Sequence, residues 1–216
     1  MGQAMRAMSY DRSLNEKNAI QALDFVGSNL RWHRLDDGVM GGKSETILGS
    51  TDKTLHFKGI INTDGGGFAS MRTTIADSVL TNDICALRLK FRGDGKTYKF
   101  LMSDGSRSTG GPFAKRPTWQ IDIPTKNMRA ENVASFEELI LPFKDFKPSF
   151  GGRSSSKPSA EEMNEFILDT SEIKLFGIMI SLRLSDGSPN PPETFGTGMF
   201  DFNLDICSIT PVYQLS

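Results

Sequence analysis

The chain has 216 residues, of which 38% are hydrophobic and 24% charged, with 25 Lys and Arg against 26 Asp and Glu. This composition supports a packed core and excludes a wholly disordered chain, a collagen and a disulfide scaffold. The formal net charge of −1 argues against binding through overall charge to nucleic acid, which we do not expect as a partner.

The N-terminal residues 1–17 contain no apolar run of the kind that forms a secretory signal. We interpret them as a flexible segment that precedes a single β-sandwich domain over residues 18–216. A helix is predicted over Asn18–Leu30, because apolar residues recur there near helical spacing. No run approaches the roughly 20 apolar residues of a membrane-spanning helix, so we expect no transmembrane segment.

The strongest periodicity further along the chain is two, which is typical of strands with one buried and one solvated face. It predicts an all-β fold, an antiparallel β-sandwich or jelly roll with one or two short peripheral helices. Gly177 is expected to mark a bulge or bend. The predicted strands are Leu55–Ile61, Phe68–Ile75, Ile84–Arg92, Tyr98–Met102, Trp119–Ile123, Phe136–Leu141, Ile173–Leu184 and Met199–Ile206.

Long connections separate some of these strands. The connections Ser103–Pro117, Lys144–Pro158 and Ser185–Gly198 are rich in flexible residues, and loops of this length tend to be functional or mobile. A capping box begins at Ser159, directly after Pro158, and predicts the second short helix.

Cysteine and histidine, which often act in catalysis or metal binding, are few: the chain has two of each. Cys85 and Cys207 lie in apolar strands, so we interpret them as small buried thiols rather than a disulfide. His56 is predicted to be solvated on a polar strand face. His33 is assigned to a polar turn, although a histidine near two carboxylates can also do acid–base chemistry. No phosphate-binding loop, dinucleotide fingerprint or nucleophile elbow is complete, and we predict no enzymatic activity, no cofactor and no metal.

Three glycine-punctuated strings are the most informative part of the sequence. They are WHRLDDGVMGGKS at Trp32–Ser44, GGGFASMR at Gly65–Arg72 and RGDGKTY at Arg92–Tyr98. Glycine permits tight turns and close backbone approach, so turn formation is the simplest interpretation of each string. A salt bridge from Arg72 to an aspartate of the other strings would bring all three to one edge of the sandwich.

In this order and spacing, the strings resemble those of the complex I intermediate-associated protein family, the thirty-kilodalton group. The resemblance runs from about Leu23 to Ile209 and includes Trp119, LPFKDF at Leu141–Phe146 and the terminal strand Phe200–Ile206. It implies a galactose-binding-like β-sandwich and a non-enzymatic, chaperone-like role in building a membrane electron-transfer complex. The implied partners are protein subunits of respiratory complex I, or of a photosystem in the plastid relatives.

The resemblance also implies a place in the cell. We expect a protein that is peripheral to the membrane, on the matrix side of the mitochondrial inner membrane, with the plastid as the alternative. Whether the chain acts as a transient factor or as an accessory subunit stays open. Aromatic, arginine and loop residues of the matched strings are the expected contacts to partners. These candidates are Trp32, Asp37, Met40, Arg72, Asp94, Tyr98 and Arg153.

Two other functions remain under consideration. Core packing competes with a contact role for Trp32, Tyr98 and Trp119. If Tyr98 and Trp119 are instead exposed, they suit a carbohydrate-binding module, with Asp94 hydrogen bonding to sugar hydroxyls. A locally basic stretch from Arg107 to Arg129 permits contact with RNA, but a solvated charged loop is the simpler interpretation.

Overall fold

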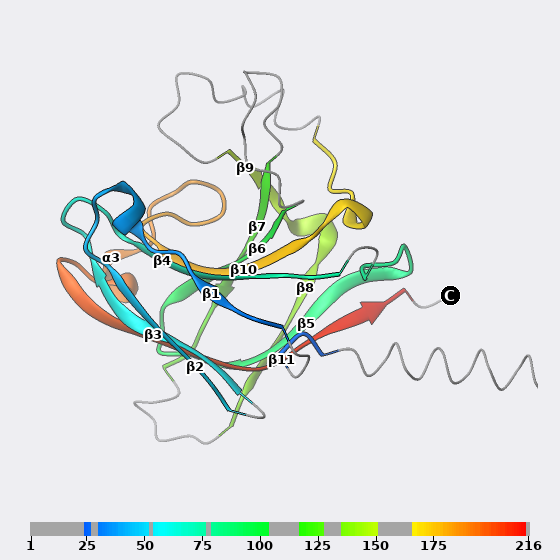
Figure 1. Cartoon of the computed structure of the whole chain (residues 1–216), viewed down its shortest axis with the longest axis horizontal. Helices are drawn as coiled ribbons and strands as arrows, with labels where there is room; N and C mark the ends of the chain where they lie inside the picture. The colour runs from blue at the N-terminus through cyan, green and yellow to red at the C-terminus, as the bar shows by residue number, and fades with distance from the viewer. Residues whose placement is uncertain are drawn as a thin grey trace, which may run out of the picture.

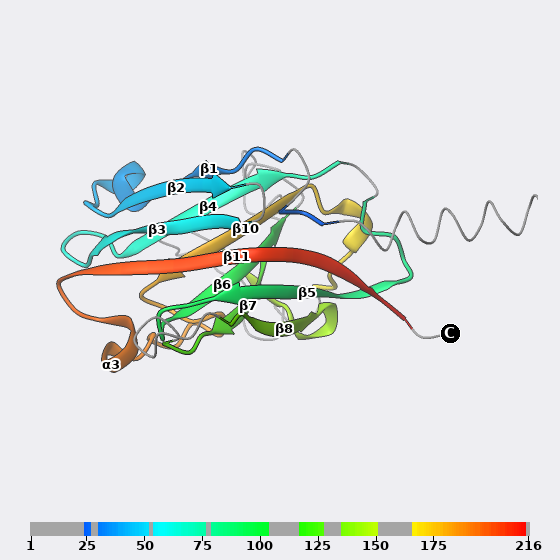
Figure 2. The same ribbon diagram turned by 90° about the horizontal axis from the view of Figure 1, so that it is seen from below.

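The computed structural model describes residues 24–26, 30–51, 54–76, 79–103, 117–127, 135–150 and 166–214. Two antiparallel sheets pack face to face in a sandwich, which confirms the predicted fold class (Figures 1 and 2). Sheet A has six strands in the order β1 (His33–Arg34), β4 (Phe68–Thr74), β10 (Leu175–Ser181), β6 (Thr97–Ser103), β7 (Thr118–Pro124) and β9 (Lys147–Ser149). Sheet B has five strands in the order β2 (Glu45–Thr51), β3 (Thr54–Asn62), β11 (Met199–Tyr213), β5 (Ile84–Arg92) and β8 (Glu137–Pro142).

The core lies between the sheets and is rich in phenylalanine. Phe57 of β3 and Phe202 of β11 contact each other within sheet B, with ring centroids 4.8 Å apart. Phe100 of β6 and Phe176 of β10 do the same within sheet A, at 5.2 Å and nearly edge-on. All four rings are essentially inaccessible to solvent. Alternation along each strand therefore places one apolar face inward, as the period of two predicts.

Each predicted strand is present, and three strands were not predicted. The short β1 and β9 carry too few residues for alternation to be visible, and β2 is mostly polar. Strand β11 also runs on to Tyr213, where it stays paired with β5 beyond a register shift between Ile206 and Ser208.

The expectation of a bulge at Gly177 is wrong. Gly177 pairs in regular register with Arg72 on one side and Leu101 on the other. A Cβ atom at this position would lie 3.2 Å from Leu101 Cδ1, which is tighter than an ordinary contact. The glycine therefore makes room for the Leu101 side chain on the outer face of sheet A.

Helical segments in the described ranges are short. They are η1 (Asp37–Met40), η2 (Phe143–Asp145), η3 (Thr170–Glu172) and α3 (Pro192–Phe195). Strand β9 follows η2 within Lys144–Pro158, and α3 lies within Ser185–Gly198, so both loops contain regular structure that we did not predict. The helix expected after Ser159 falls outside the described residues.

The described part of the other predicted helix, Asn18–Leu30, includes a turn in place of a helix. Asp24 Oδ1 accepts hydrogen bonds from the amides of Val26 (2.9 Å) and Ile209 (3.1 Å). Phe25 packs edge-on against Phe176, with centroids 4.9 Å apart. These tertiary contacts with β11 and the core outweigh the local helical pattern.

The cysteines and histidines differ in detail from expectation. Cys85 and Cys207 are free thiols, as predicted, but each is half-buried rather than fully buried. His33 lies exposed on β1 rather than in a turn. His56 is not a freely solvated side chain, because its Nδ1 lies 2.7 Å from the buried carboxylate of Asp205.

Candidate functional site

The first polar network of the glycine strings centres on Asp37, which is the first residue of η1 and is fully buried. Its carboxylate accepts hydrogen bonds from the Ser44 amide at 2.9 Å and the Ser44 hydroxyl at 2.6 Å. It also accepts from the amides of Gly67 at 2.6 Å and Phe68 at 3.2 Å. One carboxylate thus fastens the loop before β2 to the loop before β4, which joins the first two strings.

Gly42 and Gly66 lie so close to the Asp37 side chain that no other residue fits at either position. A Cβ atom on Gly42 would lie 2.3 Å from Asp37 Cγ, and one on Gly66 would lie 2.2 Å from Asp37 Oδ2. Gly41 closes η1 with a φ of 87°, in the left-handed region that favours glycine. The glycine clusters of both strings therefore form a shell around a single side chain.

The hydrogen bonds also fix the charge of Asp37. Burial on its own would raise the pKa of this carboxyl group. The Ser44 hydroxyl and the amides of Gly67, Ser44 and Phe68 outweigh burial and hold the pKa of Asp37 below its ordinary value. The side chain is therefore a charged, permanently engaged acceptor, which suits a structural role better than proton transfer.

The neighbouring Asp36 performs a related task at the edge of sheet B. Its carboxylate accepts hydrogen bonds from the amide of Thr46, at 3.0 Å, and from the Thr46 hydroxyl. Arg34 Nη1 donates to the carbonyl of Thr46 at 3.3 Å. The chain between β1 in sheet A and β2 in sheet B is therefore held at several points.

This fixed loop presents two apolar side chains to solvent. Val39 and Met40 of η1 are each 69% exposed. Other exposed apolar residues lie at the same end of the sandwich, where Figures 1 and 2 place η1, the turn before β4 and the start of β11 together. We call this set the apolar rim, and it consists of Val39, Met40, Leu182 and Met199.

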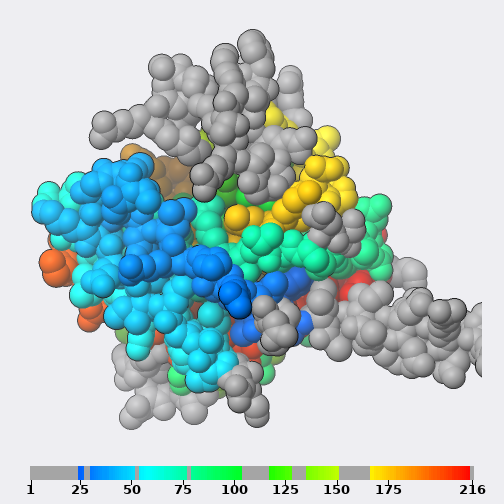
Figure 3. Space-filling model, in the orientation of Figure 1, coloured from blue at the N-terminus to red at the C-terminus, as the bar shows by residue number. Residues whose placement is uncertain are grey.

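Backbone hydrogen bonds hold the rim segments side by side. The amide of Leu182 donates to the carbonyl of Gly67 at 3.1 Å, and the amide of Thr63 donates to the carbonyl of Gly198 at 2.9 Å. An open depression of about 490 Å³ lies beside Val39, with Arg34, Lys43 and Glu45 among its lining residues. In the space-filling view, the blue residues around η1 form part of the surface at this end (Figure 3).

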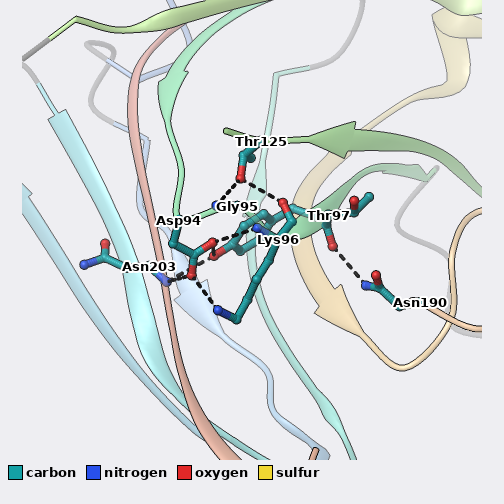
Figure 4. A network of polar contacts seen from close by, with 8 residues as sticks. Asp94, Gly95, Lys96, Thr97, Thr125, Asn190 and Asn203 are labelled. Carbon is teal, nitrogen blue, oxygen red and sulfur yellow. Dashed lines mark hydrogen bonds and ion pairs between the residues drawn. The ribbon is translucent and has the colours of Figure 1, made fainter. Parts of the chain in front are cut away.

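The third string forms a second polar network, around Asp94 (Figure 4). Asp94 Oδ1 accepts hydrogen bonds from the Tyr98 hydroxyl at 3.0 Å and the Lys96 amide at 3.2 Å. Asp94 Oδ2 accepts from the amide of Asn203 in β11 at 2.9 Å. The pairing of β5 with β11 stops at Arg92, which lies opposite Asp205. Beyond this point, the Asp94 carboxylate accepts the hydrogen bond from the Asn203 amide that a strand carbonyl would otherwise accept.

Asp94 and Tyr98 therefore hold the β5–β6 turn to sheet B. Thr125 completes the arrangement, because its hydroxyl accepts from the Gly95 amide at 3.0 Å and donates to the Lys96 carbonyl at 2.8 Å. Tyr98 itself is fully buried. Its ring and hydroxyl are occupied inside the molecule, and neither is available to a ligand in this conformation.

The salt bridge expected from Arg72 to an aspartate of the strings is absent among the described residues. The carboxylates of Asp36, Asp37 and Asp94 are each engaged by other groups. Arg72 is half-buried on β4, and its Nε has no hydrogen-bond partner. Two strings meet at Asp37, but the third is anchored separately to β11.

The other residues that were expected to contact a partner differ in how far they are buried. Trp32 is half-buried and packs against the core, and its indole Nε1 is buried without an acceptor. Met40 is the most exposed of the predicted contact residues that the structure describes. Arg153 lies outside the described residues. Val39 was not among the expected contact residues, because an isolated apolar residue in a glycine-rich string shows no periodicity. Met199 was expected only as the first residue of a strand.

A cavity of about 440 Å³ opens at one end of β7. It is lined by Trp119, Phe166 and Ile167, with the carboxylates of Asp169 and Glu172 nearby. Trp119 is only 8% exposed there. Across the described ranges, no group of three His, Cys, Asp or Glu side chains is placed to hold a metal ion. No helix in those ranges is long and apolar enough to cross a bilayer.

Comparison with known proteins supports the resemblance found in the sequence. Residues 23–206 match the model of the family described as Complex I intermediate-associated protein 30 (CIA30). A comparison with curated proteins gives no match.

Solved structures that resemble the chain include the family 11 carbohydrate-binding module of cellulosomal cellulase Lic26A-Cel5E of Clostridium thermocellum. The TM-score is 0.51 and the identity 14%, over 90% of this chain and 95% of that one. The Clostridium thermocellum family 11 module in complex with a beta-1,3-1,4-mixed-linked tetrasaccharide gives a TM-score of 0.50 and 15% identity, over 89% and 95% of the two chains. At such low identity these matches show a shared β-sandwich fold and nothing about ligands.

Proposed function

This chain belongs to the Complex I intermediate-associated protein 30 family, and from that premise we propose that it is a non-enzymatic assembly factor. It binds protein subunits of a membrane electron-transfer complex of the complex I type while that complex is built. It works as a chaperone-like docking domain, peripheral to the membrane, or stays on as an accessory subunit. The matrix side of the mitochondrial inner membrane is the favoured location, and a plastid with a photosystem as partner is the second.

The observation that carries this proposal is the exposure of Val39 and Met40 on a loop that is fixed from within. Each side chain is 69% exposed, while Asp37 in the same short helix is completely buried. A loop that is already ordered loses little conformational entropy when a partner binds. Apolar side chains held out in this way are favourable anchors in a protein interface.

The rim offers chemistry that suits a protein partner. Val39 of the rim lines the depression described above, whose other lining residues include the charged side chains of Arg34, Lys43 and Glu45. An apolar centre with a charged margin is typical of protein–protein interfaces. Asp37 and Asp94 were expected to contact a partner directly. Their proposed role is indirect, because they hold the loops in place.

A carbohydrate-binding function is less well supported. Sugar rings stack on exposed aromatic faces, but Tyr98 is fully buried and Trp119 is only 8% exposed. Asp94, the third nominated residue, already binds the amides of Lys96 and Asn203 and the hydroxyl of Tyr98. None of the three is free to bind a glycan without rearrangement.

The proposal is tested by affinity purification of the tagged full chain from organelle membranes in mild detergent. Three forms are compared: the natural chain, a rim variant with Val39→Ser and Met40→Ser, and a control with Ile47→Ser. Ile47 is 54% exposed on β2 and is not a rim residue, so the control removes an exposed apolar side chain while leaving the rim intact.

We expect complex I subunits or assembly intermediates to be retained by the natural chain and the control, and lost from the rim variant. Fractionation of the same cells identifies the organelle. Failure of the natural chain to retain any subunit of an electron-transfer complex contradicts the assembly role. Equal retention by the rim variant contradicts the assignment of the rim as the docking surface.

A further inference from the structure

A second feature of the surface is a line of apolar side chains on the outer face of sheet B. It crosses the neighbouring strands β2, β3 and β11, which lie side by side in Figure 2. Ile47 on β2 is 54% exposed, Ile60 on β3 is 38% exposed and Met199 on β11 is 68% exposed. Side chains with this much exposure are open to solvent rather than covered by the chain itself. We call these three residues the apolar stripe.

The strand register places the three side chains of the stripe on one diagonal line. Ile60 lies opposite Asp201 on β11 and opposite Glu45 on β2. Met199 comes two residues before Asp201, and Ile47 comes two residues after Glu45. Diagonal neighbours of this kind on adjacent strands lie about 8 Å apart. The stripe therefore runs without a break from the start of β11 to the edge strand β2, unlike singly scattered surface isoleucines, which need no explanation.

Charged side chains flank the apolar stripe on both sides. Glu45 lies on one side of the line, whereas Lys58 and Asp201 lie on the other. All three are exposed, and no ion pair within the described ranges includes any of them. Arg34, which lines the same depression as Glu45, donates to the carbonyl of Thr46 instead. The other charged residues around the stripe are paired with one another: Lys43 with Asp64, His56 and Arg92 with Asp205, and Lys96 with Asp94.

The flanking charges are complementary to a second copy of the same face. Lys58 and Glu45 lie on opposite sides of the stripe, and both lie in its β2 half. A two-fold axis along the stripe therefore brings Ile60 against Ile60 of the second copy, and it lays Lys58 of each copy over Glu45 of the other. Asp201 then lies over the uncharged Asn62 of the second copy, which is on the Glu45 side of the stripe. Apolar side chains meet at the centre, opposite charges meet at the margin, and no like charges are opposed.

We propose that the outer face of sheet B is a surface for weak self-association, in which the apolar stripes of two copies of this chain pack across a two-fold axis. Lys58 of each copy forms an ion pair with Glu45 of the other. The contact is small, so we expect a dissociation constant on the order of 100 μM, in the range of transient interfaces. Met199 also belongs to the apolar rim, whereas Val39 and Met40 are not part of the stripe.

The test is sedimentation equilibrium of the purified full chain, from about 10 μM to about 1 mM, which spans the expected constant. The natural chain is compared with Ile60→Ser, with Lys58→Glu and with a double variant that combines Glu45→Lys and Lys58→Glu. Ile140→Ser is the control, because Ile140 is 42% exposed on β8 at the other edge of the same sheet. Melting in dilute solution, where the chain is a monomer, verifies that each variant is folded.

The natural chain and Ile140→Ser are expected to form dimers with the same dissociation constant. Ile60→Ser and Lys58→Glu should each weaken association about tenfold, because one loses the central apolar contact and the other opposes like charges. The double variant should restore the natural constant, since each reversed charge again faces its opposite. A natural chain that stays monomeric, or equal association by Ile60→Ser, overturns the interface. A double variant as weak as Lys58→Glu overturns the two-fold arrangement. No membrane complex is present, so the result is independent of the purification experiment.

Discussion

The hydroxyl of Ser44 lies 2.6 Å from the carboxylate of Asp37, and this buried hydrogen bond joins the two ends of the DGVMGGKS string. The string is thereby closed into a loop, with Val39 and Met40 on its outside. The same carboxylate reaches the amides of Gly67 and Phe68 in the second string. A single buried charge therefore determines the shape of the surface that we propose as the docking site.

Replacing Asp37 with Asn should destabilise the fold by about 3 kcal/mol. The amide group of Asn keeps the shape but points a donor at groups that are themselves donors, namely the Ser44 hydroxyl and the amides of Gly67 and Phe68. Urea unfolding measures the loss. Asp64→Asn is the control, because Asp64 is largely exposed in its ion pair with Lys43 and should change stability little. A loss no larger than that of the control would contradict the structural role of Asp37.

The stability of the protein at acidic pH should depend on the charge of Asp37. Its pKa is lower in the folded chain than in the unfolded chain. The stabilisation by the charged form is therefore complete above the ordinary Asp pKa of about 3.9, and it is lost as the pH falls through the folded-state value. Melting temperatures measured from pH 6 down to pH 2 should fall more steeply for the natural chain than for Asp37→Asn. Parallel curves would show that Asp37 is not a source of the acid sensitivity.

Gly66→Ala should be nearly as damaging as the loss of Asp37. The new methyl group would lie 2.2 Å from Asp37 Oδ2, so the carboxylate must move away from its donors. Gly38→Ala is a matched control in the first string, because a Cβ atom there meets nothing within 4 Å. We expect a loss of a few kcal/mol, on the order of a buried polar contact, for Gly66 and almost none for Gly38. Equal melting temperatures would mean that the loop adjusts around the added methyl group.

The sequence was sufficient to predict the sandwich because its strands are amphipathic. Ile84–Arg92 alternates clearly, and strand β5 has the same bounds. Strand β2 escaped detection because its residues are mostly polar, and it is recognisable only through its pairing with β3. The turn at Phe25 likewise depends on contacts with Ile209 and Phe176, which lie far away in sequence.

The site was predictable only in part, for a similar reason. The glycine strings indicated tight turns, and these turns do surround Asp37. Their spacing did not reveal that a carboxylate lies inside the turn, since an aspartate in such a string is equally compatible with solvent.

The Asp94 network predicts an order of effects for two substitutions. Tyr98→Phe removes a hydroxyl that donates to Asp94 and accepts from the Asn203 amide, but Asp94 still accepts from that amide. Asp94→Ala removes the acceptor of the Tyr98 hydroxyl and of the Lys96 amide, together with the ion-pair partner of the Lys96 ammonium group, and leaves the Asn203 amide only the Tyr98 hydroxyl. We expect losses of about 1 kcal/mol for the first and about 3 kcal/mol for the second in urea unfolding. The reverse order would place the main anchor of the turn at Tyr98.

Lys99 on β6 is only 6% exposed. Lys99→Met should therefore raise stability at neutral pH, by about 2 kcal/mol, because methionine fills the same space without a buried charge. The folded chain releases the Lys99 proton near pH 8, whereas the unfolded chain keeps it up to about pH 10.4. The penalty of the charged lysine is therefore complete below pH 8 and is relieved as the pH rises above that value. Unfolding of both forms from pH 7 to pH 10 should show their difference in stability shrinking, with Lys58→Met unchanged relative to the natural chain. A constant difference, or a less stable Lys99→Met, would mean that the ammonium group is already compensated inside the protein.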